Sequence, residues 1–422
     1  MPSSRFVADR EQVPVVTEGR MTRLHWRVFV LCGLVALLDG FDTQSLGPAA
    51  NAIAAAIGVP VADFGPVFSA SQVGFLVGAM IFSALGDRLG RKRMLMAGTL
   101  IFAVASLATA FVSSLPELVL VRFIGGVGLG GATPNFISLA SEYSPPAQRA
   151  RIVTLLWAAV PLGGMAGAFA SALTLPLFGW RAIFFVGCLL PLFLLPVLRS
   201  RLPESAELGG GRGAIARRSF ASTFLAEGRA LPTLLLWLAS WMTWTTLVVV
   251  AFWTPPLLQH LGWSASAAAS VLGALNGGGV VGTIIVGGLL VRISAHRALC
   301  LTLFAAAAAI AGLGALTAQP GLVVAAAISV GFFASAAGGS MLAVSASLYP
   351  ADVRATGIGW ALGIGRVGAV LGPMAAGALL AANWPAQHIY YAIAVPPLLG
   401  GIFVALLAAT KPFRAARGRA VQ

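Results

Sequence analysis

The residues best suited to chemistry are two carboxylates inside an apolar segment. Asp39 and Asp42 interrupt the largely apolar run from Val28 to Ile57. On a helix, a spacing of three residues places both side chains on roughly one face, where they can share a cavity, a proton or a partner. A carboxylate at membrane depth costs about 2.5 to 3.5 kcal/mol, so two in one segment indicate a function. A structural buried ion pair is the alternative.

Two arginines also fall inside apolar segments, Arg122 and Arg366. At 1.5 Å per residue, the two aspartates lie about 20 to 25 Å from the inner start of their helix. Arg122 lies about 9 Å below the outer start of its helix, and Arg366 about 18 Å up its own. The four groups are therefore expected to line one cavity. An arginine fork suits both oxygens of a carboxylate ligand, whereas a carboxyl group removed from water favours its neutral form and can carry a proton.

The composition indicates that lipid surrounds most of the chain. It is 58% hydrophobic and 9% charged, whereas ordinary soluble domains are roughly 25% charged. The net charge of +14 comes from basic residues in short loops between apolar spans, as the positive-inside rule describes, so we expect no nucleic-acid partner. Cys32, Cys188 and Cys300 lie in separate apolar stretches without metal-ligand spacing, so neither a metal nor a cofactor is expected.

Apolar runs predict an all-α integral membrane protein with twelve transmembrane helices in two six-helix bundles. The expected helices cover 26–48, 64–86, 93–113, 116–142, 150–174, 181–199, 231–256, 264–291, 297–317, 321–349, 355–382 and 387–410. The expected divisions are a cytoplasmic tail (1–24), an amino-terminal bundle (25–199), a cytoplasmic linker (200–229), a carboxy-terminal bundle (230–410) and a second cytoplasmic tail (411–422).

Charge and an internal repeat support this organisation. If the amino terminus is cytoplasmic, all but three of the 27 Lys and Arg residues fall on the cytoplasmic side, the exceptions being Arg181, Arg122 and Arg366. Shifting the first half by 204 residues (74 to 278) places Gly74 over Gly278, and a shift of 205 (126 to 331) places Gly126 over Gly331. Parallel repeats of six helices enclose a midplane site in many transporters.

The loop from Gly86 to Arg93 reads GDRLGRKR. It resembles the hallmark loop between helices 2 and 3 of the major facilitator superfamily. The resemblance implies that Asp87 forms a cytoplasmic charge network that holds the two bundles together in the outward-facing state. The residues expected in this gate are Asp87, Arg88, Arg91, Glu142 and Arg149. The alternative is that these charges only set the topology.

Two further stretches extend the resemblance. Arg122 precedes a glycine run, 125–131, that resembles a superfamily motif linked to proton transfer. The stretch 354–373 around Arg366, together with Asp39-Gly40-Phe41-Asp42 and Trp253-Thr254-Pro255, is similar to the aromatic acid:proton symporters. Members of that subfamily carry 4-hydroxybenzoate, benzoate or protocatechuate.

We therefore expect proton-coupled import of an aromatic carboxylic acid by alternating access. Arg366 is expected to bind the substrate carboxylate. Asp39 or Asp42 carries the proton, and Arg122 pairs with the ionised aspartate and releases the protonated one. The other residues expected at the substrate are Gln44 and Asn135 for a ring hydroxyl, and Trp241 and Trp360 for the ring. The proton gradient replaces any cofactor.

The expected setting is the bacterial cytoplasmic (inner) membrane, with both termini cytoplasmic and the chain a monomer in the lipid bilayer. An exporter or antiporter of drugs or other organic anions remains the alternative, because the hallmark loop is shared across directions of transport. An enzyme is not expected, since Asp39 and Asp42 are the only acidic pair at depth. A channel fits the two-half repeat less well than alternating access does.

Overall fold

The computed structural model describes residues 21–205, 224, 228–290, 292–350 and 353–410. Most of the two expected tails and of the linker, together with Val291, lie outside these residues. Within the described part, twelve helices are long and apolar enough to cross a membrane. The predicted all-α class and the number of spans are therefore confirmed.

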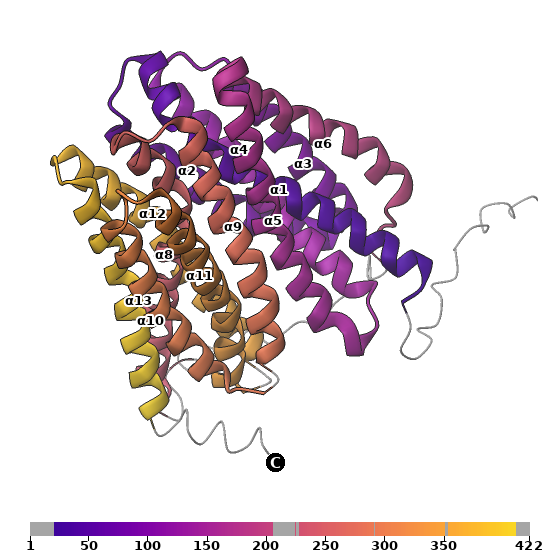
Figure 1. The fold of residues 1–422 in the computed structure, drawn as a ribbon. Coiled ribbons are helices and arrows are strands. Elements are labelled where there is room, and N and C mark those ends of the chain that lie inside the picture. Colours follow the sequence, from indigo (N-terminus) through magenta and orange to yellow (C-terminus); the bar gives the residue numbers. More distant parts are fainter. Residues whose placement is uncertain (1–20, 206–223, 225–227, 291, 351–352, 411–422) are drawn as a thin grey trace, which may run out of the picture.

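The helices form two groups that lie side by side (Figure 1). The first contains α1 (Arg23–Ile57), η1 (Val61–Phe64), α2 (Gly65–Leu89), α3 (Arg91–Thr109), α4 (Leu115–Glu142), η2 (Pro146–Gln148), α5 (Arg149–Phe178) and α6 (Arg181–Arg201). The second contains α8 (Ala230–His260), α9 (Ala265–Leu289), α10 (Ala295–Ala315), α11 (Pro320–Leu348), α12 (Arg354–Ala381) and α13 (Ala386–Ala409). The groups meet through α5 with α9, α2 with α12 and α1 with α8.

Helix α1 continues past Pro48, where the sequence predicted its end, and stops at Ile57. An internal proline removes one ladder hydrogen bond but does not always terminate a helix. The residues after Pro48 include four alanines between 49 and 54, and alanine is the strongest helix former. Gly58, in the left-handed conformation with φ 72°, ends the helix.

Glycines related by the internal repeat allow corresponding pairs of helices to pack closely in the two groups. A Cβ on Gly74 of α2 would collide with the carbonyl of Phe123 on α4, and a Cβ on Gly278 of α9 with the carbonyl of Ile328 on α11. The same correspondence holds for two more pairs of contacts. Gly78 lies against Val127 as Gly282 lies against Phe332. Gly126 lies against Ser71 as Gly331 lies against Leu275. Because small residues allow helix backbones to approach closely in a membrane, the sequence repeat corresponds to a repeated helix crossing.

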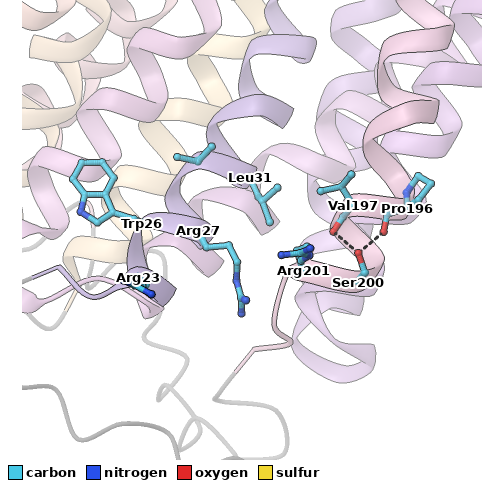
Figure 2. Close-up of a pocket in the computed structure, with 9 residues that line it drawn as sticks. Arg23, Trp26, Arg27, Leu31, Pro196, Val197, Ser200 and Arg201 are labelled. Atoms are coloured by element: carbon cyan, nitrogen blue, oxygen red, sulfur yellow. Dashed lines mark hydrogen bonds between the residues drawn. The ribbon is translucent and has the colours of Figure 1, made fainter.

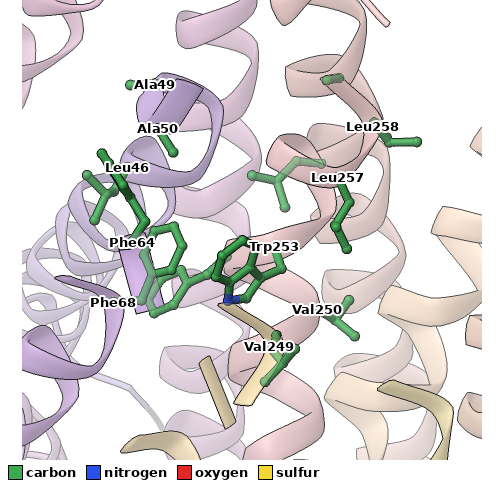
Figure 3. Close-up of a cluster of buried hydrophobic side chains, with 14 of the residues drawn as sticks. Leu46, Ala49, Ala50, Phe64, Phe68, Val249, Val250, Trp253, Leu257 and Leu258 are labelled. Carbon is green, nitrogen blue, oxygen red and sulfur yellow. The ribbon is translucent and has the colours of Figure 1, made fainter. Parts of the chain in front are cut away.

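The two groups converge at one side of the membrane. We call the side at which α1 begins, and which carries Arg88 to Arg93 between α2 and α3, the basic face. At the opposite face, Phe68 of α2 stacks on Phe252 of α8 with ring centroids 4.9 Å apart. The buried cluster drawn in Figure 3 includes Phe64, Phe68 and Trp253, whose indole Nε1 donates to the Pro373 carbonyl of α12 at 3.1 Å.

A reciprocal pair of hydrogen bonds joins α1 to α8 at the opposite face. Asn51 of α1 donates to the Pro256 carbonyl of α8 at 3.5 Å, and Gln259 of α8 donates to the Pro48 carbonyl of α1 at 3.2 Å. Gly47, directly before Pro48, allows the close approach of the two helices, because a Cβ there would be 3.0 Å from the Phe252 carbonyl. We call these two hydrogen bonds the proline clasp.

Toward the basic face the same helices are exposed. Met80 and Ile81 of α2 are 69% and 47% exposed, and Trp360 of α12 is 45% exposed. A Cβ on Gly359 or Gly363 of α12 would have nothing within 4 Å. The aromatic stack, the Trp253 hydrogen bond and the proline clasp therefore join the two groups at the opposite face, whereas Gly359 and Gly363 of α12 have open space beside them toward the basic face.

Candidate functional site

Asp42 and Arg122 form a buried ion pair within the first group of helices. The Arg122 Nη2 atom lies 3.4 Å from both the Asp42 Oδ2 atom and the Asp42 carbonyl oxygen. Both side chains are 4% exposed. On α6, Phe184 lies 5.9 Å from the Arg122 guanidinium, and Gly187 would place a Cβ 3.7 Å from Asp42 Oδ1. A charge in such a site is tolerated only because its partner is present.

Asp39 has a different environment from Asp42. Thr133 of α4 donates to its Oδ2 atom at 3.0 Å, and Thr43 donates to its Oδ1 atom at 3.3 Å. The carboxylate also interacts electrostatically with Arg366, which belongs to α12 in the second group. The spacing of three residues therefore gives the two aspartates separate hydrogen-bond partners inside the first group, and Asp39 in addition lies within electrostatic reach of Arg366.

Arg366 is held between two aromatic rings from opposite groups. Its guanidinium carbon lies 4.0 Å from the centroid of the Phe75 ring on α2 and 4.2 Å from that of Trp244 on α8. Its Nη1 atom donates to Gln72 Oε1 of α2 at 3.2 Å. Stacking on ring faces fixes the plane of a guanidinium while leaving its edge available for a planar, bidentate acceptor.

Gln44 and Asn276 form a second polar contact across the interface. The Asn276 Nδ2 atom donates to the Leu272 carbonyl of its own helix α9 at 3.0 Å, so its Oδ1 atom is the acceptor for Gln44 Nε2 at 3.0 Å. This order directs Gln44 to present its Oε1 atom, which is buried and has no hydrogen-bond partner. Gly164 of α5 gives the pair room, because a Cβ there would be 2.8 Å from Asn276 Oδ1. The arrangement offers one buried acceptor.

The other predicted substrate residues are placed differently. The amide nitrogen of Asn135 donates to two carbonyls of the first group, those of Gly131 at 2.8 Å and Phe82 at 3.3 Å. Trp360 stacks on Trp237 with centroids 5.8 Å apart, nearer the basic face than Arg366. Trp241 is half-buried on α8 and packs where Gly368 of α12 leaves space. The structure brings Gln44 and Arg366, rather than these three, to inter-group polar contacts.

The predicted gate residues lie at the basic face. Arg91 pairs with Glu142 and lies 3.2 Å from Asp87, which is 53% exposed. Arg149 donates instead to the Ser144 carbonyl at 3.2 Å, and Arg88 is exposed. Each of these three contacts joins residues of the first group.

Four neighbours of the site are absent from the residues predicted to bind the substrate or the proton, and they are Gln72, Phe75, Thr133 and Trp244. A helical signal existed for Thr133, because it follows Arg122 by eleven residues, close to three full turns, and so lies on the same face of α4. Gln72 is an amide in an apolar run, and Phe75 follows it by three residues. Trp244 could not be separated from the other tryptophans of α8 without knowledge of which face meets α12.

Among the described residues, no group of three or more His, Cys, Asp or Glu side chains could hold a metal ion. The arrangement offers instead a stacked guanidinium, two buried carboxylates and one buried amide acceptor, divided between two groups of helices. These parts can bind an anion and take up a proton.

Comparison with known proteins identifies relatives over almost the whole chain. The family model described as Major Facilitator Superfamily matches residues 32–319. The chain is 36% identical to the 3-(3-hydroxy-phenyl)propionate transporter of Escherichia coli K12, over 89% of this chain and 92% of that protein. It is 33% identical to the gallate transporter of Pseudomonas putida (90% and 91% covered) and to the 4-hydroxybenzoate transporter of Pseudomonas aeruginosa (90% and 92% covered).

Solved structures with the same fold include a D-xylose-proton symporter, with a TM-score of 0.76 at 15% identity, covering 91% of this chain and 97% of that one. The inward open conformation of the xylose transporter XylE from Escherichia coli gives a TM-score of 0.75 at 17% identity, with 92% and 97% covered. The family match, the full-length relatives and the shared fold agree with the repeated helix crossings. The chain belongs to the major facilitator superfamily.

Proposed function

We propose that this chain imports an aromatic carboxylic acid together with protons, by alternating access between its two bundles. The observation that carries the proposal is Arg366, an intramembrane guanidinium clamped by Phe75 and Trp244 from opposite bundles. Its site lies where the bundles meet, so a ligand held there contacts both halves. The relatives named for gallate, 4-hydroxybenzoate and 3-(3-hydroxy-phenyl)propionate support a ligand that combines an aromatic ring with a carboxylate.

The substrate carboxylate pairs with the edge of the Arg366 guanidinium. Gln72 accepts one of the five guanidinium N–H groups, and a bidentate carboxylate uses two more. The substrate ring then lies in an environment rich in tryptophan, with Trp244 at the guanidinium, Trp241 one turn away on α8 and Trp360 toward the basic face. Aromatic pairs in such a site contribute about 0.5 to 1.5 kcal/mol each beyond their buried area.

A ring hydroxyl is recognised by Gln44 in preference to Asn135. Asn276 donates to the Leu272 carbonyl and accepts from the Gln44 amide nitrogen. Gln44 is therefore left with a buried carbonyl oxygen that can only accept a hydrogen bond. A phenolic hydroxyl is a donor of the right kind, and a buried acceptor without a donor is costly. The Asn135 amide nitrogen is already engaged by two carbonyls, so Asn135 is the weaker of the two predicted contacts.

Proton coupling rests on Asp39, Asp42 and Arg122. Protonation of Asp42 removes its attraction for Arg122 and lets the arginine move within the first bundle. Protonation of Asp39 removes a competing negative charge that faces Arg366 and so favours the incoming carboxylate. The free energy comes from the proton gradient, and no cofactor takes part.

Alternating access exchanges the two faces. The present structure, closed by the proline clasp at the opposite face, is the inward-facing state when the basic face is cytoplasmic. In the outward-facing state Asp87 leaves solvent and meets the amino-terminal end of α12, whose helix dipole favours a carboxylate. Arg88, Arg91, Glu142 and Arg149 complete this gate.

The protein is a multi-pass membrane protein. We place it in the bacterial cytoplasmic membrane with both termini cytoplasmic, because the arginine-rich junctions then lie on the inner side. A monomer suffices, since each chain contains both bundles of the transport unit. The partners are the aromatic acid, protons and the bilayer, without nucleic acid.

Transport in proteoliposomes tests the proposal. Uptake of radiolabelled 4-hydroxybenzoate is driven by an acidic exterior while a dye inside reports pH, and protein-free liposomes correct for passive entry of the neutral acid. We expect uptake accompanied by internal acidification, and competition by benzoate, protocatechuate and gallate. Competition by non-aromatic acids alone would exclude the substrate class. Internal alkalinisation on substrate entry would indicate an antiporter or exporter instead.

Separate variants test which of the two aspartates carries the proton. Asp39→Asn and Asp42→Asn are compared with Asp63→Asn, which alters an exposed acid in η1. The residue that carries the proton is the one whose amide variant loses gradient-driven uptake but keeps substrate exchange across the membrane. If both site variants retain gradient-driven uptake, neither aspartate carries the proton.

A further inference from the structure

A cavity lies at the basic face between the start of α1 and the end of α6, away from the transport site. Its volume is about 680 Å³, and Figure 2 shows its lining from both helices. Helix α1 supplies Arg23, Trp26, Arg27, Val30 and Leu31, and α6 supplies Pro196, Val197, Ser200 and Arg201. These nine residues are called the α1–α6 cleft.

The polar end of the α1–α6 cleft is strongly basic. Arg23, Arg27 and Arg201 contribute three positive charges, and no acidic side chain lines the cleft. Among the described residues, none of the three guanidinium groups has a hydrogen bond or ion pair. Arg27 and Arg201 both project into the gap between the helices (Figure 2). Like charges brought together without a counter-ion repel one another, so the cleft favours an anion.

The other end of the cleft is apolar and faces outward. Trp26, Val30 and Val197 are 53%, 50% and 41% exposed, and the surface continues to Leu34 and Phe193, which are 40% and 74% exposed. A tryptophan beside arginines at a helix end is typical of the membrane interface. An occupant of the whole cleft must therefore combine an anionic group with a long apolar part.

We propose that the α1–α6 cleft binds an anionic phospholipid of the leaflet at the basic face. Its phosphate pairs with Arg27 and Arg201, with Arg23 at the entrance, and an acyl chain lies over Val30, Val197 and Pro196. Arginine forks match phosphate oxygens, and basic pockets between transmembrane helices bind anionic headgroups. Pro196 also borders a second, largely apolar cavity of about 430 Å³ that α6 forms with α3.

Free phosphate shares the headgroup chemistry but not the apolar contacts. Purified full-length protein stripped of lipid is therefore titrated with dioleoyl phosphatidylglycerol, with dioleoyl phosphatidylcholine, and with inorganic phosphate. Native mass spectrometry counts bound molecules, and thermal unfolding reports stabilisation. We expect phosphatidylglycerol to bind and raise the Tm, phosphatidylcholine to bind more weakly, and phosphate to have little effect.

Two double variants, each of which removes two positive charges, test whether the lipid binds in the α1–α6 cleft. Arg27→Gln/Arg201→Gln removes two charges from the cleft, and Arg292→Gln/Arg297→Gln removes two exposed charges from the second bundle. We expect the cleft variant to weaken phosphatidylglycerol binding roughly 10- to 30-fold and the control variant to have no such effect. Arg27→Lys/Arg201→Lys keeps the charges and guards against misfolding, and it should retain most of the binding.

Three outcomes would overturn the proposal. The first is an equal loss of lipid binding in both glutamine variants, which would mean that net charge rather than the cleft attracts the lipid. The second is unchanged binding in the cleft variant, which would mean that the lipid binds elsewhere on the protein. The third is equal stabilisation by inorganic phosphate, which would mean that the apolar wall contributes nothing.

Discussion

Replacing Arg366 by lysine tests the site most directly, because it keeps the charge and removes the planar fork. The guanidinium is stacked at 4.0 and 4.2 Å on Phe75 and Trp244 and bonds Gln72. An ammonium group is a point charge that cannot pair with both carboxylate oxygens in the same plane. Arg366→Lys should therefore weaken substrate binding while the helices remain packed.

The size of the effect follows from what is lost. One charge-assisted hydrogen bond contributes about 1.5 to 3 kcal/mol, and poorer stacking on the two rings removes a few tenths to about 1 kcal/mol more. A loss of about 2 to 4 kcal/mol corresponds to a roughly 30- to 700-fold rise in the Kd for 4-hydroxybenzoate.

Binding is measured by isothermal titration in detergent, and KM by uptake into proteoliposomes. Arg181→Lys is the matched control. Arg181 also stacks on a tryptophan, 4.4 Å from the Trp180 ring, and donates to the Ala110 carbonyl at 3.0 Å, but it lies at the start of α6 on the opposite face. The control should bind substrate as the unmodified protein does.

A normal Kd in Arg366→Lys would remove Arg366 from the substrate site. So would an equal loss in Arg181→Lys, because the effect would then not be specific to the interface between the bundles. Thermal unfolding of both variants separates weaker binding from misfolding.

Three further predictions concern specificity and packing. Gln44→Leu should lower the preference for 4-hydroxybenzoate over benzoate roughly 3- to 10-fold in uptake competition, and an unchanged preference would contradict the hydroxyl contact. Arg122→Gln should cost about 3 to 5 kcal/mol of unfolding free energy, and adding Asp42→Asn should restore part of it; additive losses in denaturant titrations would mean that the two are not coupled. Gly278→Ala should destabilise by about 1 to 3 kcal/mol, while Gly288→Ala, with open space around it, should not lower the Tm.

The fold could be predicted because the hydropathy pattern gives the number of helices and the internal repeat gives their division into two bundles. Twelve apolar runs specify the helices, and the repeated glycines specify how equivalent helices pair within each bundle. The resemblance to aromatic acid carriers is likewise confirmed by relatives named for gallate, 4-hydroxybenzoate and 3-(3-hydroxy-phenyl)propionate. Membership of a transporter superfamily also agrees with the expectation that the chain is not an enzyme.

The partners of individual side chains were less predictable. A depth calculation brought Arg122 level with the two aspartates, but it could not choose between them. Three residues along a helix turn the side chain by about 300°, or 60° short of a full turn. This difference directs Asp42 to α4 and α6 of the first bundle, and Asp39 also toward Arg366 of α12. Only the packing of both bundles around α1 decides this division.

Contacts between the bundles were the least predictable. Phe75 is an ordinary apolar residue in the sequence, and its role depends on α12 reaching α2 at Arg366. Asn276 likewise becomes significant only because α9 meets α1 at Gln44. Local sequence patterns describe one helix at a time, whereas these contacts join segments more than 200 residues apart.

The proline clasp has a consequence for the balance between the two transport states. Its two neutral amide–carbonyl hydrogen bonds, at 3.2 and 3.5 Å, together contribute about 1 to 3 kcal/mol. That amount corresponds to a roughly 5- to 150-fold bias in the population of the closed opposite face. A ligand whose affinity differs between the states by the same factor cancels the bias, and one whose affinity differs by about the square of that factor reverses it. The clasp thus holds α1 against α8 weakly enough for substrate and proton binding to reset which state prevails.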